Sequence, residues 1–537
     1  MFRKILSILV AMFMFLPNAH SAEMVNVEYI HQYLNVRWGI DLPYGPELTN
    51  PRVAANMKYL LTVVDIANEY LNGDKTTDYG NSEYATLAAA DTVATKKAID
   101  TLISVPTFTI TTTPGTYSFS MIISAAGNFT IDWGDGQSDV ITDKPIGATT
   151  YTHAYSSSSA HKIKLTGLAT DYSDEVADAA VSFYTSTQNV YNISKISGSL
   201  GKIFPTLPDG SQPRFYETFY NSNYYASRLR EIPADLFAGI HGAPAEYMFY
   251  RTFRGAAITE IPDGLFAGIQ GPPAEYMFSN TFSGTAITEI PANLFAGIQG
   301  APARSMFAST FSNTDITEIP ADLFAGIQGA PAVGMFEGTF SGTAITEIPA
   351  NLFAGIQGAP AANMFYITFS STRITEIPDG LFAGIRGTPA SSMFNATFSN
   401  CSRLQSIPEN LFAGIQGAPA SSMFYHTFSQ CTQLQSIPEN LFAGISGAPA
   451  QDMFYGTFYR CYKLQSIPEN LFGNISGPAA GWMFYSTFRE CTSLTGPSAR
   501  INGQYLYEIW PNVSTELRTY EDATGLSDYE QIPSNWK

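Results

Sequence analysis

Apolar residues recur at a long, regular interval over roughly residues 200–495. The proline of an Ile-Pro dipeptide falls every 29 residues at positions 233, 262, 291, 320, 349 and 378, and every 30 residues at 408, 438 and 468. Self-similarity at a period between about 20 and 50 residues is typical of solenoids, in which each unit covers the apolar face of its neighbour. The pattern therefore predicts an array of about ten coils, each of 29 or 30 residues.

Within one unit the spacing of apolar residues changes between two segments. Residues 417–431 carry apolar or small side chains at a recurring spacing: Met423, Phe424, Thr427, Phe428 and Cys431. This spacing fits one face of a short helix, and Pro419 stands where a first helical turn tolerates proline. Residues 404–407, "LQSI", have apolar ends and are followed by Pro408, which is typical of a short strand. We therefore expect a mixed α/β solenoid, with a strand, a turn and a short helix in each coil.

The residues beside the Met-Phe pair differ most between units. The corresponding stretches read "EYMFYR", "RSMFAS", "VGMFEG", "QDMFYG" and "GWMFYS". Such variation is typical of exposed positions, and on the predicted helix it marks the solvent side. Two explanations are open: drift without consequence, or tuning of recognition by a partner.

All four cysteines occupy the same position of the 30-residue units: Cys401, Cys431, Cys461 and Cys491. In the 29-residue units this position holds Thr285, Thr314, Thr343 and Thr372. A column with one cysteine per coil does not converge on a metal ion from several directions. Side chains that point the same way rarely meet disulfide geometry. We therefore expect a structural role as buried free thiols, with bridges between neighbouring coils as the alternative in an exported protein.

A glutamate precedes the isoleucine of Ile-Pro in the first six units: Glu231, Glu260, Glu289, Glu318, Glu347 and Glu376. On a strand these side chains would point outward, and stacking would align them at about 4.8 Å. Like charges on paired strands are unfavourable, so this glutamate column is either tolerated through solvation or used. A basic partner surface or loosely held divalent cations would use it. The column is our candidate binding surface.

Three stretches resemble a known repeat: "TFSNCSRLQSIPENLF" at 397–412, "TFSQCTQLQSIPENLF" at 427–442 and "TFYRCYKLQSIPENLF" at 457–472. They are similar to the A-F-x-x-C-x-x-L-x-x-I-x-I-P pattern of BspA-type (Treponema-type) bacterial leucine-rich repeats. This unit is longer and ends its strand at the first Ile-Pro. The resemblance implies a leucine-rich-repeat solenoid over residues 186–495, a surface location, and adhesion to proteins of a host or a neighbouring cell.

A second resemblance lies ahead of the array. The residues Trp133-Gly134-Asp135-Gly136, followed by His153-Ala154-Tyr155, resemble the pattern of PKD (polycystic kidney disease) domains. The alternating segments "NFTIDW" and "HKIKLTG" independently predict half-buried strands. The resemblance implies a small β-sandwich over residues 105–185, used as a spacer or adhesion module in extracellular proteins.

Four residues of this segment are expected to have structural roles: Trp133, Asp135, His153 and Tyr155. His153 would pack beside Trp133, and Asp135 would form a turn. The alternatives are a ligand site that includes His153, or calcium bound by Asp132 and Asp135.

The remaining segments lie before and after the two regions described above. Residues 1–22 have a basic start, an apolar run too short for a good membrane span, and small residues at the exit, which predicts a secretory signal peptide. Residues 23–104 carry two helical patterns and predict a helical hairpin. Residues 496–537 break the period and are expected to cap the last coil.

Composition limits the function. A net charge of −18 argues against nucleic acid as a partner. The scattered histidines match no common hydrolase, metalloprotease or phosphate-binding motif, so we expect no enzyme, cofactor or metal. The sequence predicts a secreted or cell-surface protein, without a membrane span, that binds an extracellular protein. A structural spacer in an envelope or matrix is the alternative, a carbohydrate-binding or enzymatic surface protein is a more distant one, and the oligomeric state is open.

Overall fold

The computed structural model describes residues 106–184, 192–222, 227–513 and 516–537, and Pro106–Lys537 form one compact unit. Residues 1–105, on which the signal peptide and the helical hairpin are predicted, lie outside the described residues. The helices of the described residues are short: α6 (Leu200–Ile203), α7 (Leu506–Ile509) and the 3-10 helix η3 (Tyr529–Gln531).

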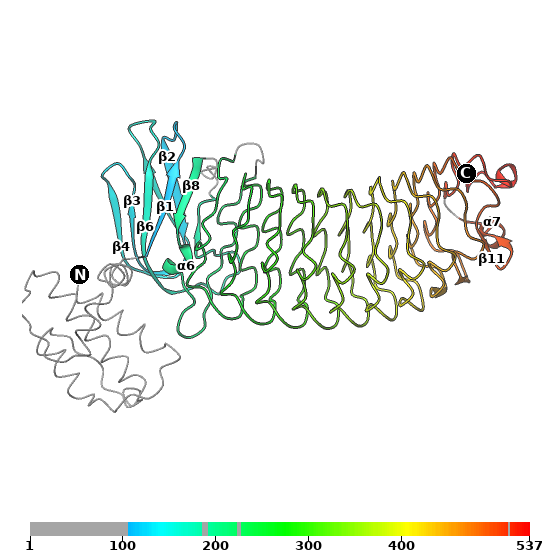
Figure 1. Cartoon of the computed structure of the whole chain (residues 1–537), viewed down its shortest axis with the longest axis horizontal. Coiled ribbons are helices and arrows are strands. Elements are labelled where there is room, and N and C mark those ends of the chain that lie inside the picture. The colour runs from blue at the N-terminus through cyan, green and yellow to red at the C-terminus, as the bar shows by residue number, and fades with distance from the viewer. Residues whose placement is uncertain (1–105, 185–191, 223–226, 514–515) are drawn as a thin grey trace, which may run out of the picture. The chain divides into compact units, whose positions relative to one another are not determined.

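Two antiparallel sheets form the first part of the described chain (Figure 1). Their strands are β1 (Thr107–Thr112), β2 (Ser118–Ile123), β3 (Ala126–Asp132), β4 (Ser138–Lys144), β5 (Thr149–Ala154), β6 (Lys162–Asp171), β7 (Val181–Ser182) and β8 (Ile193–Gly198). One sheet has the order β4-β3-β6-β1-β8 and the other the order β5-β2-β7. Strand alternation directs Phe108 and Ile110 of β1 and Phe119 of β2 into one shared apolar core.

The repeat units lie side by side in chain order (Figure 1), but they contain neither the expected helix nor the expected strand. Within residues 227–495, regular strands are limited to β9 (Ser446–Gly447) and β10 (Asn474–Ile475). Elsewhere, neighbouring coils pair through single parallel bridges, such as Gly300 with Ile327. Gly300 N donates to Gly326 O at 2.9 Å, and Gly300 O accepts from Gln328 N at 2.8 Å. The predicted fold class, an α/β leucine-rich-repeat solenoid, is therefore wrong.

A run of turns replaces the predicted helix. Phe307 N donates to Met335 O of the next coil at 3.1 Å, whereas Ala308 N donates to Ser305 O of its own coil at 3.1 Å. The backbone φ angle is positive at Ser305 and again at Ser309, which a right-handed helix does not allow. A helix would use its amides within the coil. The turns instead free alternate amides to join neighbouring coils.

An extended link replaces the predicted strand. Ile287 and Ile290 are 0% and 7% exposed, whereas Thr288 and Glu289 between them are both exposed. Buried residues three positions apart do not fit the two-residue alternation of a strand. Pairing is correspondingly weak, because Thr317 N reaches Thr288 O only at 3.4 Å.

Phenylalanine rings form three ladders through the array. The central stacked pairs are Phe278–Phe307, Phe282–Phe311 and Phe295–Phe324, with centroids 5.9, 6.0 and 6.3 Å apart. Their planes differ by only 3°, 4° and 8°. All of these rings are at most 3% exposed, so the coils share one continuous core. Stacked aromatic pairs add about 0.5–1.5 kcal/mol to the stabilisation from burial.

A buried threonine, which directly precedes one of the stacked phenylalanines in each coil, also links neighbouring coils. Thr310 Oγ1 lies 2.9 Å from Phe278 O of the preceding coil and 2.8 Å from Phe307 O of its own. The same bond to the preceding coil recurs at Thr252, Thr281, Thr339, Thr368, Thr397, Thr427, Thr457 and Thr487. These hydroxyls supplement the sparse backbone pairing.

Both ends of the array are covered. At the first coil, Phe219 packs against Phe183 and Phe108, with centroids 5.2 and 6.3 Å away, so the sheets continue the aromatic core. At the last coil, Tyr520 stacks on Phe488 at 5.9 Å. The C-terminal segment also contains α7 and the hairpin of β11 (Arg500–Ile501) and β12 (Gln504–Tyr505). Stacked repeats need such covers because their end units otherwise expose apolar surface.

Candidate interaction surfaces

The six side chains of the glutamate column are all exposed. Among the residues that the structure describes, none of them forms an ion pair with a basic side chain. No group of three or more His, Cys, Asp or Glu side chains in the described ranges is arranged to hold a metal ion. The column therefore offers negative charge to solvent without a built cation site.

The structure brings the four predicted structural residues of the β-sheet region into one cluster. His153 stacks on Trp133 with a centroid distance of 5.1 Å, and His153 Nε2 lies 2.8 Å from Asp135 Oδ2. Tyr155 donates through its hydroxyl to Trp133 O at 3.0 Å. His161, which the sequence reasoning missed, stacks on Tyr155 at 3.6 Å. The hydrogen bond with His153 holds the pKa of Asp135 below its ordinary value.

The carboxylates of this cluster are used within the turn that follows β3. Asp132 Oδ1 accepts from Gly134 N at 2.9 Å, and Asp135 Oδ1 accepts from Gln137 N at 3.1 Å. Each carboxylate therefore accepts a hydrogen bond from a backbone amide of its own turn. The arrangement fixes a turn and packs aromatic rings against one another.

The four cysteines are free and 0% exposed. Cys431 Sγ lies 3.2 Å from Phe398 O of the preceding coil, whereas Thr285 Oγ1 donates to Phe282 O of its own coil at 2.7 Å. Cysteine and threonine thus occupy the same position of the repeat, but they contact the carbonyl oxygens of different coils. Burial raises the pKa of Cys401 to about 11, which keeps the thiol protonated and unreactive at neutral pH.

Tyrosines gather on the turns beside the Met-Phe pairs near the C-terminal end of the array. Tyr425, Tyr455 and Tyr485 come from three consecutive coils, and each neighbouring pair has centroids 4.6 Å apart. Trp482 begins the turn that contains Tyr485 and is 44% exposed. We call these four residues the tyrosine ladder. Its tyrosines are half-buried, and burial raises the pKa of Tyr455 to about 12.

The same position holds smaller residues in the middle of the array. Ser279 and Ala308 stand there, and both are buried. Aromatic residues return at this position in the first coils, where Tyr216 and Tyr250 stack with centroids 5.0 Å apart. In the sequence the ladder is marked by a tyrosine directly after Met-Phe in three successive units. Only the structure shows that these rings stack on one another.

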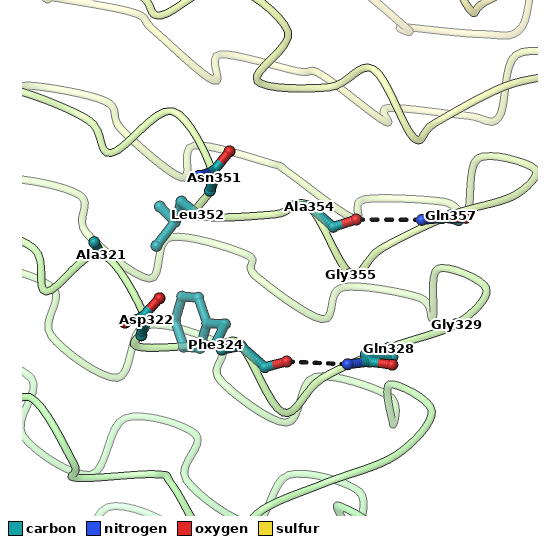
Figure 2. A pocket seen from close by; sticks show the side chains of 11 residues that line it. Ala321, Asp322, Phe324, Gln328, Gly329, Asn351, Leu352, Ala354, Gly355 and Gln357 are labelled. Carbon is teal, nitrogen blue, oxygen red and sulfur yellow. Dashed lines mark hydrogen bonds between the residues drawn. The ribbon is translucent and has the colours of Figure 1, made fainter.

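Shallow pockets lie between coils on another part of the surface. One has a volume of about 670 Å³ between residues 321–329 and 351–357, and Figure 2 shows its lining. A second, of about 640 Å³, lies one coil earlier between residues 292–300 and 322–328. Asp322 and Gln328 line both pockets. The sequence reasoning did not identify this feature.

No protein-family model, curated protein or solved structure matches this chain. The resemblances to BspA-type repeats and to PKD domains therefore stay predictions. In the described part of the chain, no helix has both the length and the apolar character needed to cross a membrane.

Proposed function

We propose that this protein is exported and binds an extracellular protein of a host or neighbouring cell through its stacked repeats. The observation that carries the proposal is the tyrosine ladder. Tyrosine and tryptophan are enriched at protein interfaces and among the residues that dominate binding energy. Stacking already restrains the three ladder tyrosines, so they would lose little further side-chain entropy on binding.

The ladder is not required by the stack itself. Ser279 and Ala308 occupy the equivalent position in central coils, where Phe278 and Phe307 still stack at 5.9 Å. A protein that served only as a spacer would gain nothing from exposing Trp482. The aromatic side chains at these variable positions therefore favour recognition over the spacer alternative.

Charge suggests the rim of the interface. Asp452 lies on the turn that contains Tyr455, since Tyr455 N donates to Asp452 O at 3.2 Å. The protein carries a net charge of −18. A partner with basic residues around an apolar or aromatic centre would complement this surface, and the charges would raise the association rate.

The proposal is tested with the full-length protein on immobilised extracellular-matrix proteins and on intact cells. The variant Tyr455→Ala/Trp482→Ala removes the centre and the most exposed ring of the ladder. The loss of hot-spot residues, worth about 2 kcal/mol or more, predicts at least about thirtyfold weaker binding. Tyr117→Ala is the matched control, because Tyr117 is 65% exposed in the β-sheet region. Equal binding by both variants, or binding to no matrix protein or cell, would reject the proposal.

A further inference from the structure

The inter-coil pockets repeat over three consecutive coils. We define the inter-coil trough by its polar walls: Asn293, Asp322 and Asn351 on one side, and Gln299, Gln328 and Gln357 on the other. Figure 2 shows Asp322 and Asn351 on one side of a pocket and Gln328 and Gln357 on the other. Each coil therefore presents one carboxylate or carboxamide and one glutamine across a shallow floor.

Each glutamine of the trough makes one long, exposed contact with the backbone of its own coil. The side-chain amide of Gln328 donates through Nε2 to Ala325 O at 3.4 Å, and Gln299 and Gln357 repeat this contact with their own alanines at the same distance. The contact leaves Oε1 of each glutamine to accept a hydrogen bond from a ligand. The floor between the walls includes exposed alanine residues such as Ala325 and Ala354.

The chemistry of the trough selects among classes of ligand. Its lining includes no cationic side chain, and Asp322 adds a negative charge, so a phosphate, sulfate or uronate polymer is disfavoured. Its phenylalanines are buried, Phe324 being 3% exposed, so no aromatic anchor is offered to a protein. Side-chain amides both donate and accept hydrogen bonds, as hydroxyl groups do. A polyhydroxylated neutral chain matches these groups.

We infer that the inter-coil trough binds a linear neutral polysaccharide that runs across successive coils. The phenylalanines of this segment stack at 6.3 Å per coil, from Phe295 to Phe324 and from Phe324 to Phe353, so successive coils present the same polar groups in a regular series that suits a repeating polymer. Each coil contributes only a few exposed hydrogen bonds, so a single sugar binds weakly. Affinity must rise steeply with chain length as further coils are engaged. In the next coil Arg386 replaces the glutamine and ends the uniform stretch.

Affinity electrophoresis of the full-length protein tests this inference. The gels contain hydroxyethyl cellulose, a linear mannan or anionic polygalacturonate. We expect at least one neutral polysaccharide to retard the protein and polygalacturonate to leave its mobility unchanged. The triple variant Gln299→Ala/Gln328→Ala/Gln357→Ala should lose the retardation, because its affinity for the polysaccharide should fall at least about tenfold. The control Thr288→Ala/Thr317→Ala/Thr346→Ala changes exposed residues of the same coils outside the trough and should keep it.

A second variant tests whether the opposite wall of the trough also contributes to binding. Asn293→Ala/Asn351→Ala alters the opposite wall and should also reduce retardation, with an unchanged melting temperature. Absence of retardation in both neutral gels, equal retardation by polygalacturonate, or full retention by both trough variants would overturn the inference. Tyr455→Ala/Trp482→Ala should leave polysaccharide binding intact, which separates this result from the protein-binding proposal.

Discussion

Replacing Phe311 by alanine should strongly destabilise the repeat array. The ring is 0% exposed and stacks between Phe282 and Phe340, with centroids 6.0 and 5.9 Å away. Truncation of a buried phenylalanine to alanine costs about 3–5 kcal/mol. Two stacked pairs are lost as well, so we expect about 4 kcal/mol. Phe311→Leu fills most of the space and loses mainly the stacking, which predicts about 1.5 kcal/mol.

Guanidinium unfolding of the full-length variants measures these costs. Thr317→Ala is the control, because Thr317 is exposed in the neighbouring link and should change stability by less than about 0.5 kcal/mol. Repeat arrays can unfold in parts, so the slope as well as the midpoint must be compared. A cost below about 1 kcal/mol for Phe311→Ala would refute the closed aromatic ladder.

The remaining predictions concern thiols, pH, glycine and salt. The four cysteines should react with a thiol reagent only after denaturation, and a mass spectrum with a disulfide would contradict their burial as free thiols. Burial lowers the pKa of His426, so the unfolded chain takes up a proton first as the pH falls below about 6.5, and stability present above that pH is lost. His426→Gln should reduce this loss in melting curves at about pH 5 and about pH 7.5, and equal losses would contradict the reasoning. Gly326→Ala should lower the free energy of unfolding by about 1–3 kcal/mol, because a Cβ there would collide with Ile298 O. In the same unfolding assay Gly481→Ala should be nearly neutral, because no atom lies closer than 4.0 Å to the added Cβ. Sodium chloride and calcium chloride at equal ionic strength should raise the melting temperature equally, and a calcium-specific rise would reveal a cation site that the geometry does not show.

The period of the array could be predicted from the sequence, but the backbone of the coil could not. The buried residues of one turn segment, Met306, Phe307, Thr310 and Phe311, recur every four residues. Over one repeat, that spacing is hard to distinguish from a helix with 3.6 residues per turn, although a strict spacing of four drifts by about 40° per step around a helix. Positive φ angles at Ser305 and Ser309 turn the chain at the same interval. No particular residue type marks the positions with positive φ angles, because several different side chains occupy them.

The strand prediction failed for a reason that was visible in the sequence. Ile287-Thr288-Glu289-Ile290 places its apolar residues three apart, whereas a half-buried strand needs them two apart. The outward position of the glutamates was predicted through strand geometry that does not exist. Glu289 is nevertheless exposed, because both polar residues of the link face solvent.

The candidate surfaces were less accessible to sequence reasoning than the core. The packing of His153 beside Trp133 could be predicted because the two residues stand in two short motifs that resemble one known domain. The stacking of His161 on Tyr155 closes the short connection between β5 and β6, and no motif in the sequence marks His161 for it. The tyrosine ladder and the inter-coil trough arise only when residues about 30 positions apart become neighbours, as Tyr455 and Tyr485 do.

Oxidative footprinting of the protein with its captured partner is the most direct test of recognition through the tyrosine ladder. Trp482 and the ladder tyrosines should lose reactivity in the complex. Tyr117 and Tyr462, which are 65% and 37% exposed outside the ladder, should react as they do in the free protein. Protection of Tyr117 or Tyr462, with Trp482 left fully reactive, would show that the partner binds elsewhere and would refute recognition through the ladder.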